Sequence, residues 1–207
     1  MSDQVEMTNP VDQSIGGMSG HVLRRGIHLG MSFIPVLFFE FGDDVADKVD
    51  LSLSQVVSVV ILAAIVGEAV RLKLGVTIIG QRAYEAKQVS ALAWGAIGIG
   101  MVLLLVPEKE YAYPLILSLS LGDPLLGEMR RKDFSVSSVI WAGTLGVGII
   151  WAACAVWVGT PWLLVALMGP ICVASEWPRL RYIDDNATML LIPLAAVLIL
   201  EPFLGVL

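Results

Sequence analysis

Hydrophobic residues along this chain gather in long runs that short polar segments separate. The runs approach the roughly 17–25 residues that an α-helix needs to cross the hydrocarbon core of a bilayer. Backbone groups in lipid must hydrogen-bond within their own segment, so the runs predict helices. The predicted spans are 27–42, 53–70, 89–106, 111–127, 138–158, 161–177 and 187–206. The first and sixth contain Pro35 and Pro170, so we expect about seven spans, with six as the alternative.

This pattern predicts an all-α, polytopic integral membrane bundle. A single transmembrane helical catalytic domain over residues 21–207 would follow a flexible polar tail over residues 1–20. The tail lacks a basic segment followed by an apolar one, so no cleaved signal peptide is predicted. The composition also predicts a membrane protein, because 57% of the 207 residues are hydrophobic and only 15% are charged. Soluble domains typically have about 25% charged residues. Cys154 and Cys172 lie in apolar runs and predict buried free thiols.

Basic residues occupy alternate connections between the predicted spans. Of the 13 Lys and Arg residues, only Lys48 and Lys109 lie in the other set of connections. The positive-inside rule therefore predicts a cytoplasmic N-terminus and an external C-terminus. The formal net charge of −6 argues against a nucleic-acid partner, which would need a positive surface.

Charged and polar residues also stand at the ends of the predicted spans, all on the predicted cytoplasmic side. Such residues are costly at membrane depth and commonly mark a functional site. They are Arg24, Arg25, His28, Glu68, Arg71, Asp123, Glu176, Asp184, Asp185 and Asn186, joined by the loop residues Arg130, Arg131 and Lys132. Their convergence on one face predicts a single site at the cytoplasmic surface.

Most of these residues have a structural alternative, whereas Asp123 is harder to explain without a function. The alternatives are membrane anchors (Arg24, Arg25, the 130–132 loop), a core histidine (His28), an i, i+3 ion pair (Glu68 with Arg71) and helix N-caps (Asp184, Asn186). Pro124 disfavours helical dihedrals at Asp123, and Gly122 loosens the backbone before it. The segment "LGDP" therefore predicts a broken helix that presents a carboxylate inside the bundle.

This set of residue types suits phosphoryl transfer. Mg²⁺ is commonly held by one or two carboxylates together with substrate phosphates, and arginines clamp phosphate oxygens. Phosphoryl transfer requires mostly positioning and charge stabilisation. A lipid hydroxyl from the bilayer and a nucleotide from the cytoplasm would meet at this face. The sequence contains no Walker A loop, no protein-kinase signature and no Ser-His-Asp constellation in its usual surroundings.

Four segments, in order, resemble motifs of the dolichol kinase and phytol kinase family of CTP-dependent polyprenol kinases. They are "RRGIHLG", "GEAVRL", "LGDPLLGEMRRK" and "EWPRLRYIDDNATMLLIPL", and together they extend over roughly residues 22–200. The resemblance implies a multispanning enzyme that moves the γ-phosphoryl group of CTP, with Mg²⁺, to a long-chain isoprenoid alcohol. It supplies the positions of the site residues, and charge type suggests their roles.

Three sets of roles follow. Asp123 and Asp185 are expected to hold the metal and, with His28, to act in catalysis. The expected nucleotide contacts are Arg24, Arg25, His28, Arg130, Arg131, Lys132 and Asn186. The expected supporting residues are Glu68, Arg71, Glu176 and Asp184. The identity of the lipid alcohol and the oligomeric state stay open.

Two other functions stay open at this stage. Arg25 stands where the family usually has Lys, and "KDFSVSSVIWAG" lacks the glycines of the usual Gly/Lys-rich stretch. The segment "GDPLLGEMRRKD" also resembles CDP-lipid synthases, although their His-Gly-Gly and Asp-Arg-x-Asp signatures are missing. The third alternative is a small transporter or lipid-binding protein, but transporter sites lie at the midplane, whereas these polar residues gather at one face.

Overall fold

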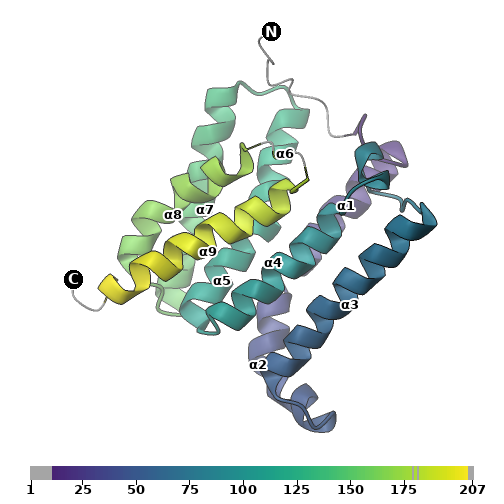
Figure 1. The fold of residues 1–207 in the computed structure, drawn as a ribbon. Coiled ribbons are helices and arrows are strands. Elements are labelled where there is room, and N and C mark those ends of the chain that lie inside the picture. The colour runs from purple at the N-terminus through teal and green to yellow at the C-terminus, as the bar shows by residue number, and fades with distance from the viewer. Residues whose placement is uncertain (1–10, 179, 181, 205–207) are drawn as a thin grey trace.

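The computed structural model describes residues 11–178, 180 and 182–204, and this part of the chain is all-helical, as the sequence predicts (Figure 1). Ser14 and Arg82 form an isolated antiparallel bridge. A 3-10 turn, η1 (Ala83–Ala86), and a π-helical turn, η2 (Ser118–Gly122), lie between helices. The α-helices are α1 (Gly17–Met31), α2 (Ile34–Lys48), α3 (Leu53–Leu74), α4 (Ala91–Leu105), α5 (Lys109–Leu117), α6 (Asp123–Arg131), α7 (Val136–Trp157), α8 (Trp162–Glu176) and α9 (Asp185–Leu204).

Several helices have the length and composition of membrane spans. Among the described residues, α3, α7 and α9 are long and apolar enough to cross a bilayer, and α1 with α2, bent by 50°, counts as a fourth if the pair is one span. Helices α4 and α8 are apolar but have 15 residues each. Apolar side chains cover the outside of α7, where Val156 is 80% exposed and Trp141 74% exposed. An apolar exterior of this kind indicates a membrane protein.

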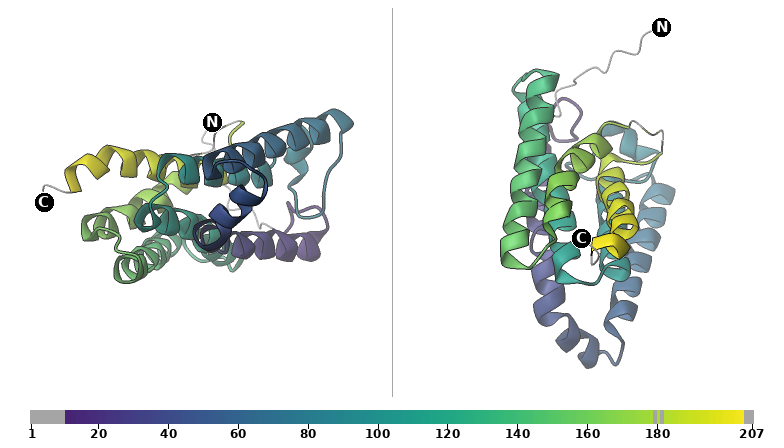
Figure 2. Two further views of the ribbon diagram at one scale, coloured as in Figure 1. Left: turned by 90° about the horizontal axis from the view of Figure 1, so that it is seen from below. Right: turned by 90° about the vertical axis from the view of Figure 1, so that its left-hand side faces the viewer.

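The helices pack in two layers (Figure 2). Helix α4 lies between α3 and α9 in one layer, while α6 and η2 contact α1 and α7 in the other. Helix α8 packs against both α7 and α9 and closes one edge. The core between the layers contains fully buried side chains such as Trp151, Leu115, Met168 and Leu190. The predicted thiols Cys154 and Cys172 are buried and free.

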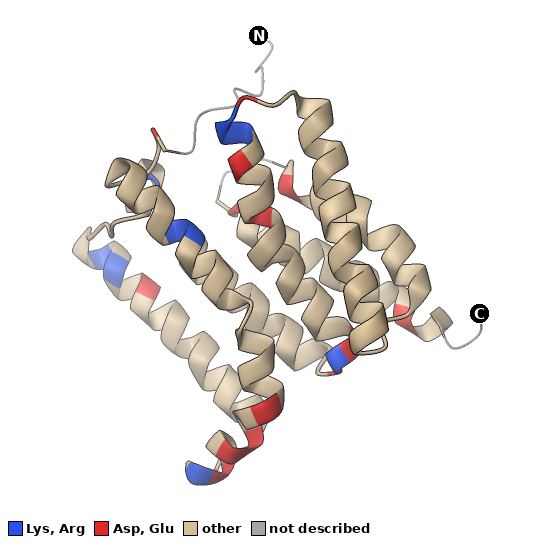
Figure 3. Ribbon diagram, turned by 180° about the vertical axis from the view of Figure 1, so that it is seen from behind, with Lys and Arg blue, Asp and Glu red and all other residues tan. Residues whose placement is uncertain are grey.

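Lys and Arg gather toward one end of α3 and α6, whereas acidic residues gather at the end of α2 that leads into α3, on the other side of the bundle (Figure 3). The residues before α1 contact the basic end of the bundle. Ile15 N donates to Gln81 O at 2.8 Å, and Gly80 N donates to Ile15 O at 2.9 Å. Helix α1 begins at Gly17, inside the range predicted as a flexible tail, and residues 1–10 of that range lie outside the described residues.

The central segment α5–η2–α6 remains helical through two prolines. Pro114 has no amide hydrogen, so the carbonyl of Glu110 lacks its usual helical donor, and the Thr160 hydroxyl donates to it at 2.6 Å. The π-helical turn η2 then leads directly into α6, where Asp123 has helical dihedrals of φ −58° and ψ −46°. The predicted helix break at this point is therefore wrong. Pro124 lies in the first turn of α6, where a proline is tolerated. The wider turn η2 before it lets the chain continue without a break.

Candidate functional site

Three carboxylates at helix ends meet inside the bundle and are called the acidic cluster below. Asp123 begins α6, Glu176 ends α8 and Asp185 begins α9. One oxygen from each side chain lies within 4.8 Å of the other two. Among the described residues, Glu176 Oε2 and Asp185 Oδ1 have no hydrogen-bond partner although both atoms are buried. Unpaired buried oxygens are costly, so the cluster retains acceptors that suit a bound cation.

The acidic cluster fits a divalent cation such as Mg²⁺. Mg²⁺ binds oxygens at about 2.1 Å with octahedral geometry, so two of its ligands lie roughly 3–4 Å apart. The 4.8 Å spread of the three oxygens is close to that range. Asp123 and Asp185, the predicted metal ligands, are thus brought together by the fold. Glu176, expected only to support the site, contributes the third oxygen.

Two residues of α1 face the Asp123 carboxylate. Arg25 Nη1 donates to Asp123 Oδ2 at 2.5 Å, and His28 Nδ1 lies 3.4 Å from the same oxygen. Their i, i+3 spacing puts both side chains on one face of the helix. Arg25 passes over α6 at Gly127, where an added Cβ would lie 1.7 Å from Arg25 Nη2. Only a glycine at this position lets Arg25 follow this path to Asp123, a role that sequence analysis missed.

The other two carboxylates each have their own arginine. Arg130, in the last turn of α6, donates to Glu176 across the bundle. Arg82 Nη2 lies 3.8 Å from Asp185 Oδ2. Arg130 was predicted for the site, whereas Arg82 was not, because a basic residue in a polar loop gives no signal beyond the positive-inside pattern. The fold thus surrounds the acidic cluster with guanidinium groups, which are suited to phosphate oxygens.

Arg24 does not contact the acidic cluster but binds a buried glutamate that sequence analysis also missed. Glu85 is fully buried. Its Oε1 accepts from Arg24 Nη1 at 2.9 Å and from Arg82 N at 3.0 Å, and its Oε2 accepts from Ala91 N at 3.1 Å. Glu85 therefore joins α1, η1 and the start of α4. Its position in the polar segment "QRAYEAK" resembles a solvated loop, so the sequence carried no signal of burial.

Glu68 and Arg71 form the predicted ion pair and organise the connection between α3 and α4. Arg71 Nη2 donates to Glu68 Oε1 at 2.7 Å, and Glu68 also accepts from Ser90 N at 2.6 Å. Arg71 further donates to the carbonyls of Glu85 and Gln88, each at 2.9 Å. The pair fixes the loop that carries Glu85.

Arg131 and Lys132 lie farther from the acidic cluster than their neighbour Arg130. Arg131 Nε donates to Glu128 Oε2 at 2.8 Å, and the other oxygen of Glu128 contacts His21 Nε2 at 2.8 Å. Lys132 follows the last residue of α6 as its C-cap and is exposed. These two basic residues belong to the rim of the site.

Asp184 immediately precedes α9, and Asn186 lies in the first turn of that helix. Asp184 Oδ1 accepts from Asn186 N at 3.2 Å, as an N-terminal cap does. Burial and, next, the negative charge of Asp185 raise the pKa of Asp184 well above its ordinary value. Asn186 Nδ2 donates to Ala91 O at 3.0 Å, and its Oδ1 is buried without a partner in the described part of the chain.

Comparison with known protein families, curated proteins and solved structures finds no match to this chain.

Proposed function

We propose that this chain is a membrane-embedded lipid-alcohol kinase, which transfers the γ-phosphoryl group of CTP to a long-chain isoprenoid alcohol with Mg²⁺. The observation that carries the proposal is the acidic cluster, in which Asp123, Glu176 and Asp185 lie within 4.8 Å of one another and are surrounded by arginines. This combination supplies both parts of a metal–triphosphate site, because carboxylates take the metal and guanidinium groups take the phosphates. The motif order resembling dolichol and phytol kinases supports the choice of nucleotide and acceptor.

In this proposal the three carboxylates of the acidic cluster would hold Mg²⁺, and the ion would supply positive charge that neutralises the phosphates of the nucleotide. Arg25 and Arg130 already contact carboxylates of the acidic cluster. Their remaining N–H groups would donate hydrogen bonds to phosphate oxygens. A guanidinium group has five N–H donors, and one carboxylate does not use them all. Arg131 and Lys132, at the rim, attract the nucleotide from the aqueous side.

The acceptor is the hydroxyl oxygen of the lipid. This oxygen forms a bond to the γ-phosphorus, the bond from that phosphorus to the β-phosphate oxygen breaks, and CDP leaves. His28 is the proposed acceptor of the hydroxyl proton, since its imidazole lies beside Asp123 (3.4 Å between Nδ1 and Oδ2) and a nearby carboxylate stabilises the imidazolium that forms. The products are a lipid monophosphate and CDP.

We further propose seven spans with the acidic cluster at the cytoplasmic surface. The spans would be α1 with α2, α3, α4, α5–η2–α6, α7, α8 and α9. The gathering of Lys and Arg toward one end of the bundle supports this orientation (Figure 3), because basic residues are retained on the cytoplasmic side. The active site would then receive its nucleotide from the cytoplasm and its alcohol from the inner leaflet.

The test is a label-transfer assay with purified protein, Mg²⁺ and a defined polyprenol. Parallel reactions would contain CTP labelled at either the γ- or the α-phosphate. We expect label in the lipid from the γ position only. Label from the α position would instead identify a CDP-lipid synthase and overturn the proposal. Absence of transfer from CTP, with transfer from another nucleoside triphosphate, would change the donor but keep the kinase.

A further inference from the structure

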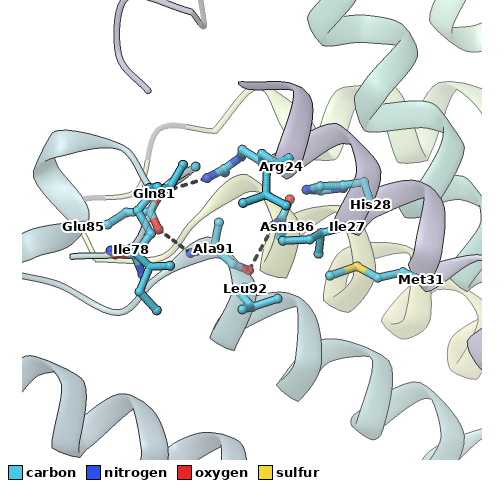
Figure 4. A pocket seen from close by; sticks show the side chains of 13 residues that line it. Arg24, Ile27, His28, Met31, Ile78, Gln81, Glu85, Ala91, Leu92 and Asn186 are labelled. Atoms are coloured by element: carbon cyan, nitrogen blue, oxygen red, sulfur yellow. Dashed lines mark hydrogen bonds and ion pairs between the residues drawn. The ribbon is translucent and has the colours of Figure 1, made fainter. Parts of the chain in front are cut away.

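A groove opens on the side of the bundle between α1, the 78–81 segment and the start of α4 (Figure 4). Its lining is mostly apolar and comes from four separate stretches of the chain. The apolar lining residues are Leu23, Ile27, Met31, Ile78, Ile79, Ala91 and Leu92. At the mouth, Ile79 is 57% exposed and Leu92 48% exposed. Exposed apolar walls of this kind match a hydrocarbon chain better than water.

The deep end of the groove is polar and lies beside the acidic cluster. His28 and Asn186 both line the groove and are both buried. Asn186 Oδ1 has no partner among the described residues, although its Nδ2 is fixed by Ala91 O at 3.0 Å. His28 connects the groove to the metal site, because its Nδ1 lies 3.4 Å from Asp123 Oδ2. A molecule in the groove would therefore end within reach of the proposed reaction centre.

The charges beside the groove favour a neutral head group over an anionic one. Arg24 lines the wall, but its guanidinium is paired with Glu85 at 2.9 Å, so the pair adds no net positive charge. The unpartnered Asn186 Oδ1 is a hydrogen-bond acceptor. A hydroxyl group, which donates one hydrogen bond, satisfies it, whereas a phosphate or carboxylate would add repulsion.

The wall formed by Ile78 and Ile79 is fixed in place. Gly80, at φ +93°, donates its N–H to Ile15 O at 2.9 Å. Gln81 Oε1 also accepts from Ile78 N at 2.9 Å. The groove is therefore a built feature of the fold, and a chain that enters it meets a preformed apolar wall.

We propose that this groove binds the hydrocarbon tail of the lipid alcohol, which enters from the bilayer between α1 and α4. Its hydroxyl donates to Asn186 Oδ1 on binding and turns to His28 when its proton is transferred. This proposal adds a binding site for the acceptor to the proposed kinase function. It rests on that function only for the phosphorylation of the hydroxyl group. The binding of a neutral, hydroxyl-terminated lipid rests on the groove alone. The two statements can therefore fail separately.

The test is photolabelling of the full chain in bilayer nanodiscs with an isoprenoid alcohol that carries a diazirine on its tail. We expect adducts on two peptides, one containing Ile27 and Met31 and the other containing Ile78 to Leu92. Unlabelled alcohol should compete for these adducts, whereas the hydrocarbon of equal length without a hydroxyl should not. Adducts spread evenly over the outer faces of α3 and α7, without competition, would overturn the proposal.

Matched tryptophan variants sharpen the test. Ile27→Trp and Leu92→Trp place bulk in the groove from two different helices, and each should lower the competed labelling about tenfold, the effect of losing about 1.4 kcal/mol of binding. Leu29→Trp is the control, because Leu29 lies on the same helix, is 49% exposed and is not part of the groove lining. Equal labelling in all three variants and in the wild type would contradict the assignment of the groove.

Combining this experiment with the label-transfer assay separates the two proposals. Competed labelling in the groove without phosphoryl transfer would leave a lipid-alcohol site and refute the kinase. Transfer from CTP with labelling elsewhere would keep the kinase and refute the groove. If both hold, Ile27→Trp should raise KM for the alcohol and leave KM for CTP unchanged.

Discussion

Gly127→Ala should damage the site without damaging the fold. Arg25 crosses α6 at Gly127 to reach Asp123, and an added Cβ would lie 1.7 Å from Nη2, 2.7 Å from Cζ and 3.2 Å from Nη1 of that arginine. The overlap is with the end of a flexible side chain, so the guanidinium moves and the backbone stays in place. The hydrogen bond from Arg25 to Asp123, 2.5 Å long, is then lost.

The two effects of the substitution have opposite signs. A charge-assisted hydrogen bond contributes about 1.5–3 kcal/mol, whereas replacing a helical glycine by alanine gains about 1 kcal/mol. The free energy of unfolding should therefore fall by only about 0.5–2 kcal/mol. If the same bond positions Asp123 for the metal, turnover should fall about 10- to 100-fold, since each 1.4 kcal/mol is a factor of ten.

Turnover would be measured by γ-label transfer, with thermal unfolding in the same detergent as the check on folding. Gly148→Ala in α7 is the matched control, because an added Cβ there meets nothing within 4 Å. A double-mutant cycle with Arg25→Met isolates the cause. Once Arg25 is replaced, the added methyl group should have almost no further effect on turnover. Equal turnover in Gly127→Ala, Gly148→Ala and wild type would refute the reasoning.

Further predictions concern the metal, the connecting loop and the topology. Asp123→Asn should lower turnover by at least about 100-fold through loss of a metal ligand, whereas Asp133→Asn, an exposed position at φ +55° that asparagine tolerates, should leave it unchanged. Asp185→Asn should raise the Mg²⁺ concentration for half-maximal activity, and an unchanged Mg²⁺ titration would remove it from the metal site. Glu85→Gln should lower the free energy of unfolding by about 1–3 kcal/mol, because a buried charged acceptor of several N–H groups is lost, while the exposed Glu201→Gln should not. A reporter fused to the C-terminus should lie outside the cytoplasm, and a cytoplasmic signal would contradict the seven-span arrangement.

Much of the fold was predictable because apolar runs carry strong local information. Lipid forces each such run to satisfy its own backbone hydrogen bonds, so the helical class follows from the pattern alone. Charges inside or beside these runs also stand out against the apolar background. That contrast identified Asp123 and Asp185, and the buried pair Glu68–Arg71 has the ion-pair geometry that its i, i+3 spacing predicts.

The helix break predicted at "LGDP" is wrong because tertiary contacts stabilise a wider helical turn there. A proline disfavours helical dihedrals in the residue before it, but a wider helical turn removes the conflict. The turn η2 is stabilised by tertiary contacts, since the Ser118 hydroxyl accepts from Trp151 Nε1 at 2.9 Å and donates to Pro114 O at 2.6 Å. Trp151 lies 33 residues away in the chain, so no local pattern predicts this contact.

By itself the sequence determined the helical class of the chain and the residue types that meet at the acidic cluster. Only the tertiary structure decided which residue faces which. It pairs Arg25 with Asp123, which is 98 residues away in the sequence, and Arg130 with Glu176, which is 46 residues away. It also buries Glu85, although the surrounding loop is polar in composition. The physical reason is that hydrophobic periodicity acts within one helix, whereas ion pairing and close approach, as at Gly127, depend on distances that arise only when helices pack.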